Sequence, residues 1–273
     1  MTYETLMVHL EASQSNANVL HVTAEIARRF QAKVIGIASC EPIQIGFGEG
    51  MMNGEIALAE RQIVDDELKV VGAEFHACEA IRPYVLQWRS IPTMEPVAHV
   101  VALEARAADL VITSVLTGVF ADTSRHADTA DLVIRAGRPV LAVPPKPVTA
   151  NFQQVMIAWN DTRECRRAVS DALPFLKEAE QVVVVGVGAD PIDIGIGVAD
   201  VVGWLSRHGI HADRIVSHAV GGGSTTLAAI ATENSIDLIV AGAYGHTRLR
   251  EWAFGGVTRD LLLQAHCCAL LSH

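Results

Sequence analysis

The residues of this chain best suited to hold a phosphate are glycines placed around one polar loop near the C-terminus. Gly242 and Gly245 follow the apolar run 238–241, and Gly255 and Gly256 come after nine further residues. Glycines let backbone N–H groups approach an anion closely, and a helix that begins behind them adds the positive end of its dipole. This spacing predicts a phosphate-binding loop, although glycines kept for sharp turns and close packing give the same pattern.

The segment that follows the glycines, residues 257–266, has apolar side chains at helical spacing and supplies that helix. Arg248, Arg250 and Arg259 stand around the loop, where they suit either an anionic ligand or a solvated surface. His246, inside the loop, is placed to orient a water for hydrolysis or to cap a carbonyl. The loop lacks a Walker-type lysine, so we expect any hydrolysis to be slow.

Two other groups of residues are candidates for a metal site or a redox pair. His208 and His211 are separated by the turn-forming Gly209 and do not share a helical face, which disfavours metal binding. The five cysteines form no zinc framework, and the adjacent Cys267 and Cys268 should point to opposite faces of a terminal strand. The sequence therefore predicts neither a metal site nor a redox pair.

The composition indicates a folded protein with room for two domains. The chain has 273 residues, of which 50% are hydrophobic, and its apolar runs are too short for a membrane span. A formal net charge of −10 disfavours binding to nucleic acid or to anionic membranes. Because the N-terminus does not have the pattern of a secretion signal, we expect a cytoplasmic location.

The chain reads as two copies of one unit. Residues 3–13 resemble residues 152–162, and similar pairs follow in the same order along both copies. The Pro-rich passage 143–148 lies between the copies and favours an extended linker. A tandem duplication explains this order and predicts domains at residues 1–146 and 150–273.

Within each copy, apolar runs of strand length alternate with longer segments of helical period. This alternation is typical of a parallel sheet with helices on both faces, the α/β class. Side-chain oxygens before two helical segments predict N-caps, one at Asp161 or Thr162 and one at Ser224 or Thr225. We expect strands near residues 6–10, 34–38, 84–88, 110–113, 140–143, 155–159, 182–187, 214–220, 238–241 and 269–272.

Residues 41–62 form an insertion between the second and third strands of the first copy. Its stretch 45–54 is rich in glycine and has no clear period. We expect a mobile excursion or a small hairpin there, which either folds over a site as a lid or stays a surface loop.

The tandem repeat, together with the spacing of Gly242, Gly245 and Gly255, resembles a two-domain universal stress protein, and the resemblance covers nearly the whole chain. It implies that each copy has a fold similar to the adenine-nucleotide alpha hydrolases, with five strands in the order 3-2-1-4-5. It also implies a ligand crevice where the first and fourth strands diverge, the usual ligand position in an open α/β sheet.

The same resemblance implies a cofactor and its contacts in the second copy. The cofactor would be ATP, with or without Mg²⁺, and its adenine would meet the main chain of Val187. Asn160 stands where the family usually has an aspartate, and Gly256 replaces a serine or threonine, so we expect weaker binding. The implied cofactor-binding residues are Asn160, Val187, Gly242, Gly245, Gly255, Gly256, Val257 and Thr258, without an assigned catalytic residue.

The first copy departs further from the pattern. Ser114 and Thr117 stand at its first two glycine positions, and residues 123–128 replace the later glycines. Side chains at these places would crowd the backbone surface that phosphates need. We therefore expect the first copy to bind no nucleotide and to pack against the second copy as subunits of this family pack in homodimers.

Together these features predict a cytoplasmic stress-response protein whose second copy binds ATP or a related adenine nucleotide and acts as a binding module or switch. A homodimer in addition to the intramolecular pairing is a further expectation. The alternative is a nucleotide-free dimeric scaffold, in which the changes at Asn160 and Gly256 have closed the site.

Overall fold

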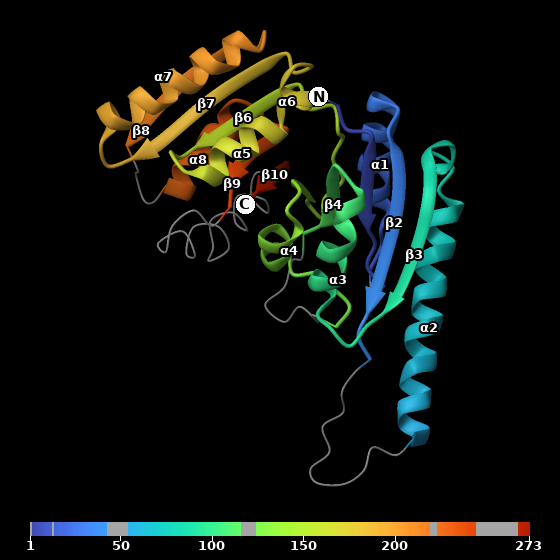
Figure 1. The fold of residues 1–273 in the computed structure, drawn as a ribbon. Coiled ribbons are helices and arrows are strands. Elements are labelled where there is room, and N and C mark those ends of the chain that lie inside the picture. The colour runs from blue at the N-terminus through green and yellow to red at the C-terminus, as the bar shows by residue number, and fades with distance from the viewer. Residues whose placement is uncertain (1, 13, 43–53, 116–123, 219–222, 244–266) are drawn as a thin grey trace, which may run out of the picture.

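The computed structural model describes residues 2–12, 14–42, 54–115, 124–218, 223–243 and 267–273 (Figure 1). The first half comprises β1 (Thr5–His9), α1 (Ala17–Phe30), β2 (Lys33–Cys40), α2 (Gly54–Ala77), β3 (Val85–Pro92), α3 (Val97–Glu104), β4 (Leu110–Ser114), α4 (Thr129–Ala136) and β5 (Val140–Val143). The second half comprises β6 (Gln154–Trp159), α5 (Arg163–Asp171), α6 (Leu173–Leu176), β7 (Gln181–Gly188), α7 (Pro191–Arg207), β8 (Ala212–His218), α8 (Gly223–Glu233), β9 (Leu238–Gly242) and β10 (Cys268–Ser272).

All these strands form one 10-stranded sheet in the order β3-β2-β1-β4-β5-β10-β9-β6-β7-β8. Within each half the pairing is parallel and the strand order is 3-2-1-4-5. The predicted α/β class and strand order are confirmed. The boundaries at residues 146 and 150 stay a prediction, because the two halves share a sheet.

The halves meet through their last strands. β5 and β10 pair antiparallel, and Leu141 lies opposite Leu270. The two leucines hold equivalent places in their halves, since Leu141 also pairs with Ile112 of β4 and Leu270 with Val240 of β9. A pseudo-twofold axis therefore passes through this leucine pair and relates the halves.

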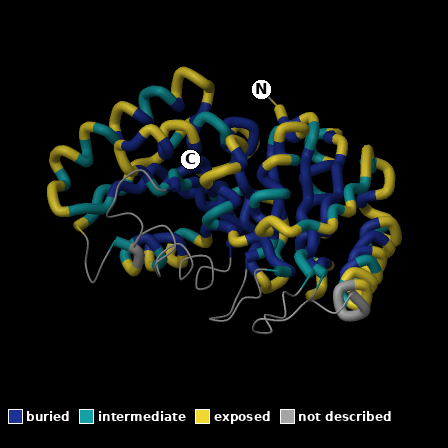
Figure 2. The backbone as a smooth tube through the Cα atoms, turned by 60° about the horizontal axis from the view of Figure 1, so that its bottom comes forward, coloured by how far each residue is buried: buried dark blue, intermediate teal, exposed yellow. Residues whose placement is uncertain are grey.

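Helices from both halves cover each face of the sheet. Buried residues of α1, α2, α5 and α7 form a core on one face, and those of α3, α4 and α8 form a core on the other. Figure 2 shows the buried strands running through the middle of the molecule, with exposed segments around them. Cys268 belongs to the first core and Cys267 to the second, which confirms that adjacent side chains of this strand point to opposite faces.

A cluster of four aromatic rings joins the halves behind the sheet. Tyr3, Phe30 and Phe152 each contact Phe175, with ring centroids 5.0 to 5.5 Å apart. The Tyr3 hydroxyl also donates to the carbonyl of Asp171 at 2.6 Å. Because Tyr3 and Phe30 come from the first half and the other two rings from the second, the halves share part of one core.

Of the two predicted helix N-caps, one is confirmed and one is wrong. Thr162 caps α5, since its Oγ1 accepts the N–H of Cys165 at 3.2 Å. The prediction of a cap at Ser224 or Thr225 is wrong, because α8 begins at Gly223 and both residues lie in its first turn. Glycine, serine and threonine are all common at helix starts, so their types alone do not fix the first residue.

The insertion of the first half is partly helical. Its residues 54–62 belong to α2, a helix of 24 residues that extends past the ends of β2 and β3 (Figure 1). The expectation of an irregular excursion is wrong for this part, because the alanine, glutamate and leucine residues here favour a helix. Residues 43–53 lie outside the described residues. Among the helices that the structure describes, we find none with the length and apolar character of a membrane span.

Candidate functional site

The strand order reverses around β6, at the carboxyl ends of the parallel strands of the second half. β6 pairs with β7 on one side and with β9 on the other, so the chain leaves β6 and β9 in opposite directions. Asn160 directly follows β6, Val187 lies near the end of β7, and Gly242 ends β9. The structure thus brings these three predicted site residues to one edge of the sheet, where open α/β sheets bind ligands.

α5 begins at this edge and directs its N-terminus toward it. The N–H of Thr162 donates to the carbonyl of Asn160 at 2.7 Å, and the Thr162 side chain caps the helix. The positive end of the helix dipole therefore lies beside Asn160. Burial raises the pKa of the nearby Cys165 thiol to about 11, so this cysteine is protonated at neutral pH and packs as a small apolar residue.

Gly242 is packed tightly against the first turn of α5. A Cβ added to Gly242 would lie 2.6 Å from Cys165 Cα and 2.6 Å from the carbonyl carbon of Glu164. Since real Cβ atoms do not approach backbone atoms so closely, this position needs glycine whether or not a ligand binds. The packing explanation accounts for Gly242 on its own, and its contact with a ligand stays a prediction.

The remaining predicted binding residues lie outside the described residues. The same holds for the loop residues to which we assigned either a ligand or a solvated role. The positions concerned are Gly245, His246, Arg248, Arg250, Gly255, Gly256, Val257, Thr258 and Arg259.

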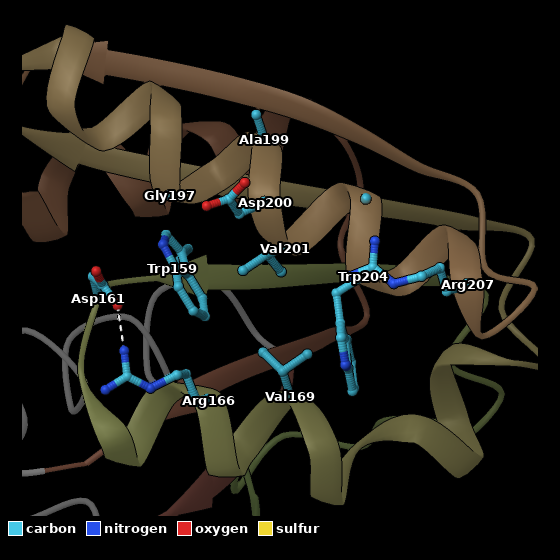
Figure 3. Close-up of a pocket in the computed structure, with 11 residues that line it drawn as sticks. Trp159, Asp161, Arg166, Val169, Gly197, Ala199, Asp200, Val201, Trp204 and Arg207 are labelled. Carbon is cyan, nitrogen blue, oxygen red and sulfur yellow. Dashed lines mark hydrogen bonds and ion pairs between the residues drawn. The ribbon is translucent and has the colours of Figure 1, made fainter.

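A groove with a volume of about 660 Å³ adjoins this edge between α5 and α7. Trp159 and Asp161, the two neighbours of Asn160, line it together with Trp204 and Val201 of α7 (Figure 3). Asp161 forms an ion pair with Arg166 of α5 at the rim. Sequence reasoning missed this groove, because it depends on the spacing of two helices that are not adjacent in the chain.

The first half has a corresponding edge, but charged and polar side chains fill it. The sheet register places Met7 and Met156 at equivalent positions, so Glu11 takes the place of Asn160. Glu11 is fully buried and binds His126, with 2.7 Å between Oε2 and Nδ1. These buried side chains lie at the position that corresponds to Asn160. The absence of a nucleotide from this half nevertheless stays a prediction.

Two buried atoms of this first-half cluster have no hydrogen-bond partner among the described residues. They are His9 Nε2 and Glu11 Oε1. The other ring nitrogen of His9 lies 3.1 Å from Thr113 Oγ1. Burial lowers the pKa of His9 to about 4, so its ring is neutral at pH 7. Within the part of the chain that is described, His, Cys, Asp and Glu form no group of three able to hold a metal ion.

A sequence model of the universal stress protein family matches residues 205–273. No curated protein is similar enough in sequence to be matched with the chain. Among solved structures, the chain is similar to a universal stress protein from Archaeoglobus fulgidus DSM 4304. The two are 11% identical, the match covers 98% of this chain and 95% of that one, and the TM-score is 0.73.

The chain is also similar in fold to a functionally unknown protein from Pseudomonas aeruginosa PAO1. Here the identity is 14%, the coverage is 99% of this chain and 92% of that one, and the TM-score is 0.56. Both matches extend over the two halves of the chain. The family model thus matches the C-terminal segment, and the chain as a whole has the same fold as the universal stress protein from Archaeoglobus fulgidus.

Proposed function

We propose that the second half binds ATP or a related adenine nucleotide, and that the protein acts in the cytoplasm as a nucleotide-dependent stress-response module or switch. The observation that carries this proposal is the reversal of strand order around β6. Because of this reversal, Asn160, Val187 and Gly242 lie at the same edge of the sheet. The glycine-spaced loop follows Gly242 in the sequence. The match of residues 205–273 to the universal stress protein family model supports the same ligand class.

In this proposal each part of the nucleotide meets a different element. The adenine lies against the main chain of Val187, and Asn160 hydrogen-bonds the ribose beside the N-terminus of α5. The phosphates, with or without Mg²⁺, accept hydrogen bonds from the backbone of the glycine loop. The loop positions concerned are Gly242, Gly245, Gly255, Gly256, Val257 and Thr258.

The protein is proposed to hold its nucleotide rather than to turn it over rapidly. The glycine loop contains no Walker-type lysine, and among the described residues at this edge the Cys165 thiol is protonated at neutral pH because burial raises its pKa. Phosphoryl transfer depends on groups that neutralise charge and position the attacking oxygen. We therefore expect hydrolysis to be slow or undetectable, which a phosphate-release assay on the purified protein measures.

The direct test is to identify what the purified full chain carries and binds. Acid quench followed by nucleotide chromatography should release adenine nucleotide, and calorimetric titration with ATP and AMP, with and without Mg²⁺, should give saturable binding. Gly245→Val should abolish both signals by filling the space proposed for the phosphates. Thr117→Val, at the equivalent position of the first half, is the control and should leave both unchanged.

A second candidate is a nucleotide-free scaffold that forms homodimers. The packing of Gly242 against α5 favours it, since that glycine is explained without a ligand. Under this alternative, chromatography releases no nucleotide and calorimetry shows no heat of binding. Sedimentation then gives twice the mass of one chain. Released nucleotide that is lost in Gly245→Val would exclude this alternative.

A further inference from the structure

The groove between α5 and α7 is walled by two tryptophans. Trp159, the last residue of β6, lies at one end of the groove, and Trp204 of α7 lies at the other end (Figure 3). Val169 of α5 and Val201 of α7, both buried, also line the groove. A volume of about 660 Å³ is within the range of small-molecule sites.

Two glycines of α7 leave room in the groove between the larger side chains of that helix. Gly197 and Gly203 line it, and a Cβ added to Gly197 would lie 3.1 Å from Trp159 Nε1. In the first half, α1 and α2 are instead tied together, since Glu74 accepts hydrogen bonds from the backbone and side chain of Asn16. The corresponding helices of the two halves therefore differ in this contact.

The aromatic walls favour a ring as the central part of a ligand. Trp159 is 8% exposed, and its indole forms a fixed surface beside Gly197. Trp204 is packed against His208, with ring centroids 4.3 Å apart. A planar ring inserted between the two indoles would make offset or edge-to-face contacts on both sides.

The charges along α7 favour a ligand with opposite charges at its two ends. Asp200 lines the groove near Trp159, Arg207 lines it near Trp204, and neither has an ion pair among the residues that the structure describes. Seven residues of helix separate them, a rise of about 10 Å. The other two charges of the lining, Asp161 and Arg166, neutralise each other as an ion pair.

We propose that this groove binds a small zwitterion with a central aromatic ring, the chemistry of a short aromatic peptide. An extended tripeptide spans about 10 Å, so its amino group and carboxylate can reach Asp200 and Arg207 together. Its central ring then lies between Trp159 and Trp204. Its lining contains none of the residues assigned to the nucleotide, so this proposal does not rest on the proposed function.

The test is calorimetric titration of the full chain with the tripeptide Gly-Phe-Gly, supported by tryptophan fluorescence. We expect saturable one-to-one binding with a dissociation constant below about 1 mM. The acetylated and amidated peptide, which has no terminal charges, should bind roughly tenfold more weakly. Gly-Gly-Gly, which has no ring, should show the same loss.

Variants locate the binding on the protein. Asp200→Asn and Arg207→Gln should each weaken Gly-Phe-Gly roughly tenfold, with no effect on the affinity of the capped peptide. Gly203→Leu should abolish binding by filling the groove. Gly195→Leu is the matched control on the same helix, because a Cβ there meets nothing within 4 Å and Gly195 does not line the groove.

Three results would each overturn the proposal. One is the absence of saturable binding to the unchanged protein at millimolar peptide. Another is equal affinity for the charged and the capped peptide. The third is unchanged binding in Gly203→Leu, provided that circular dichroism shows this variant to be folded. Nucleotide binding measured on the same samples tests the proposed function by its own readout, so failure of one proposal is distinguished from failure of the other.

Discussion

His9 couples the stability of the protein to pH. Burial lowers its pKa from 6.5 to about 4, and the nearby charges belong to Glu11 and His126. The folded state therefore favours the neutral ring. This contribution is fully present above pH 6.5 and is lost as the pH falls toward 4, because the unfolded chain binds the proton more readily.

For His9 this difference corresponds to about 3 kcal/mol of unfolding free energy between pH 7 and pH 4. We expect His9→Gln to reduce the loss of stability on acidification, measured by urea unfolding at several pH values. His21→Gln, which changes a largely exposed ring, is the control and should follow the unchanged protein. Equal pH profiles for the unchanged protein and His9→Gln would contradict the assignment.

Gly242 is predicted to be essential for packing. Gly242→Ala places a methyl group against the backbone of α5 and should lower the free energy of unfolding by about 3 kcal/mol. Gly195→Ala, in an open part of α7, should raise it by up to about 1 kcal/mol, because alanine favours the helix. Thermal unfolding of both variants without nucleotide measures the difference. Wild-type stability in Gly242→Ala would leave the glycine to be explained by ligand binding.

One aspartate holds the start of the first strand in each half. Asp237 accepts hydrogen bonds from the N–H groups of Gln153 and Gln154, at 2.7 and 3.1 Å. Asp109 does the same in the first half, where both bonds measure 2.9 Å. This hydrogen-bond arrangement occurs in both halves because each half has an aspartate just before its fourth strand. It ties β4 to β1 and β9 to β6, the pairs that border each crevice.

We expect Asp109→Ala and Asp237→Ala each to lower the free energy of unfolding by about 1 to 3 kcal/mol, since two backbone donors lose their acceptor. Asp213→Ala, an exposed aspartate on β8, is the control and should change stability by less than about 0.5 kcal/mol. Chemical unfolding measures all three. If the first two variants match the control, the repeated hydrogen bonds contribute nothing to stability.

The strands could be predicted from the sequence because nearly all are apolar runs in a parallel sheet. Parallel strands also bring their ends together, so the convergence of Asn160, Val187 and Gly242 followed from the strand order. The pair of Glu11 and His126 could not be predicted in this way, because their contact joins residues 115 positions apart. The sequence offered one signal of the polar cluster: His9 ends an otherwise apolar strand, and Glu11 follows that strand two residues later.

The two halves are predicted to unfold together. Phe175 is fully buried and touches rings from both halves, so Phe175→Ala should cost about 3 to 5 kcal/mol. Because the aromatic cluster and the pairing of β5 with β10 lie between the halves, calorimetry should show one transition moved to lower temperature. Two separate transitions in the unchanged protein would show that the halves are independent. Ile134→Ala, at an exposed position of α4, is a control that should leave the transition nearly unchanged.

The antiparallel pairing of β5 with β10 joins the two halves within one chain, and this affects which substitutions each crevice can accept during evolution. In a symmetric assembly of identical subunits, every substitution appears in both crevices at once. Covalent fusion fixes a one-to-one stoichiometry of two unlike partners and removes that constraint. Each crevice is thereby free to acquire side chains of its own, as the buried pair of Glu11 and His126 in the first half illustrates.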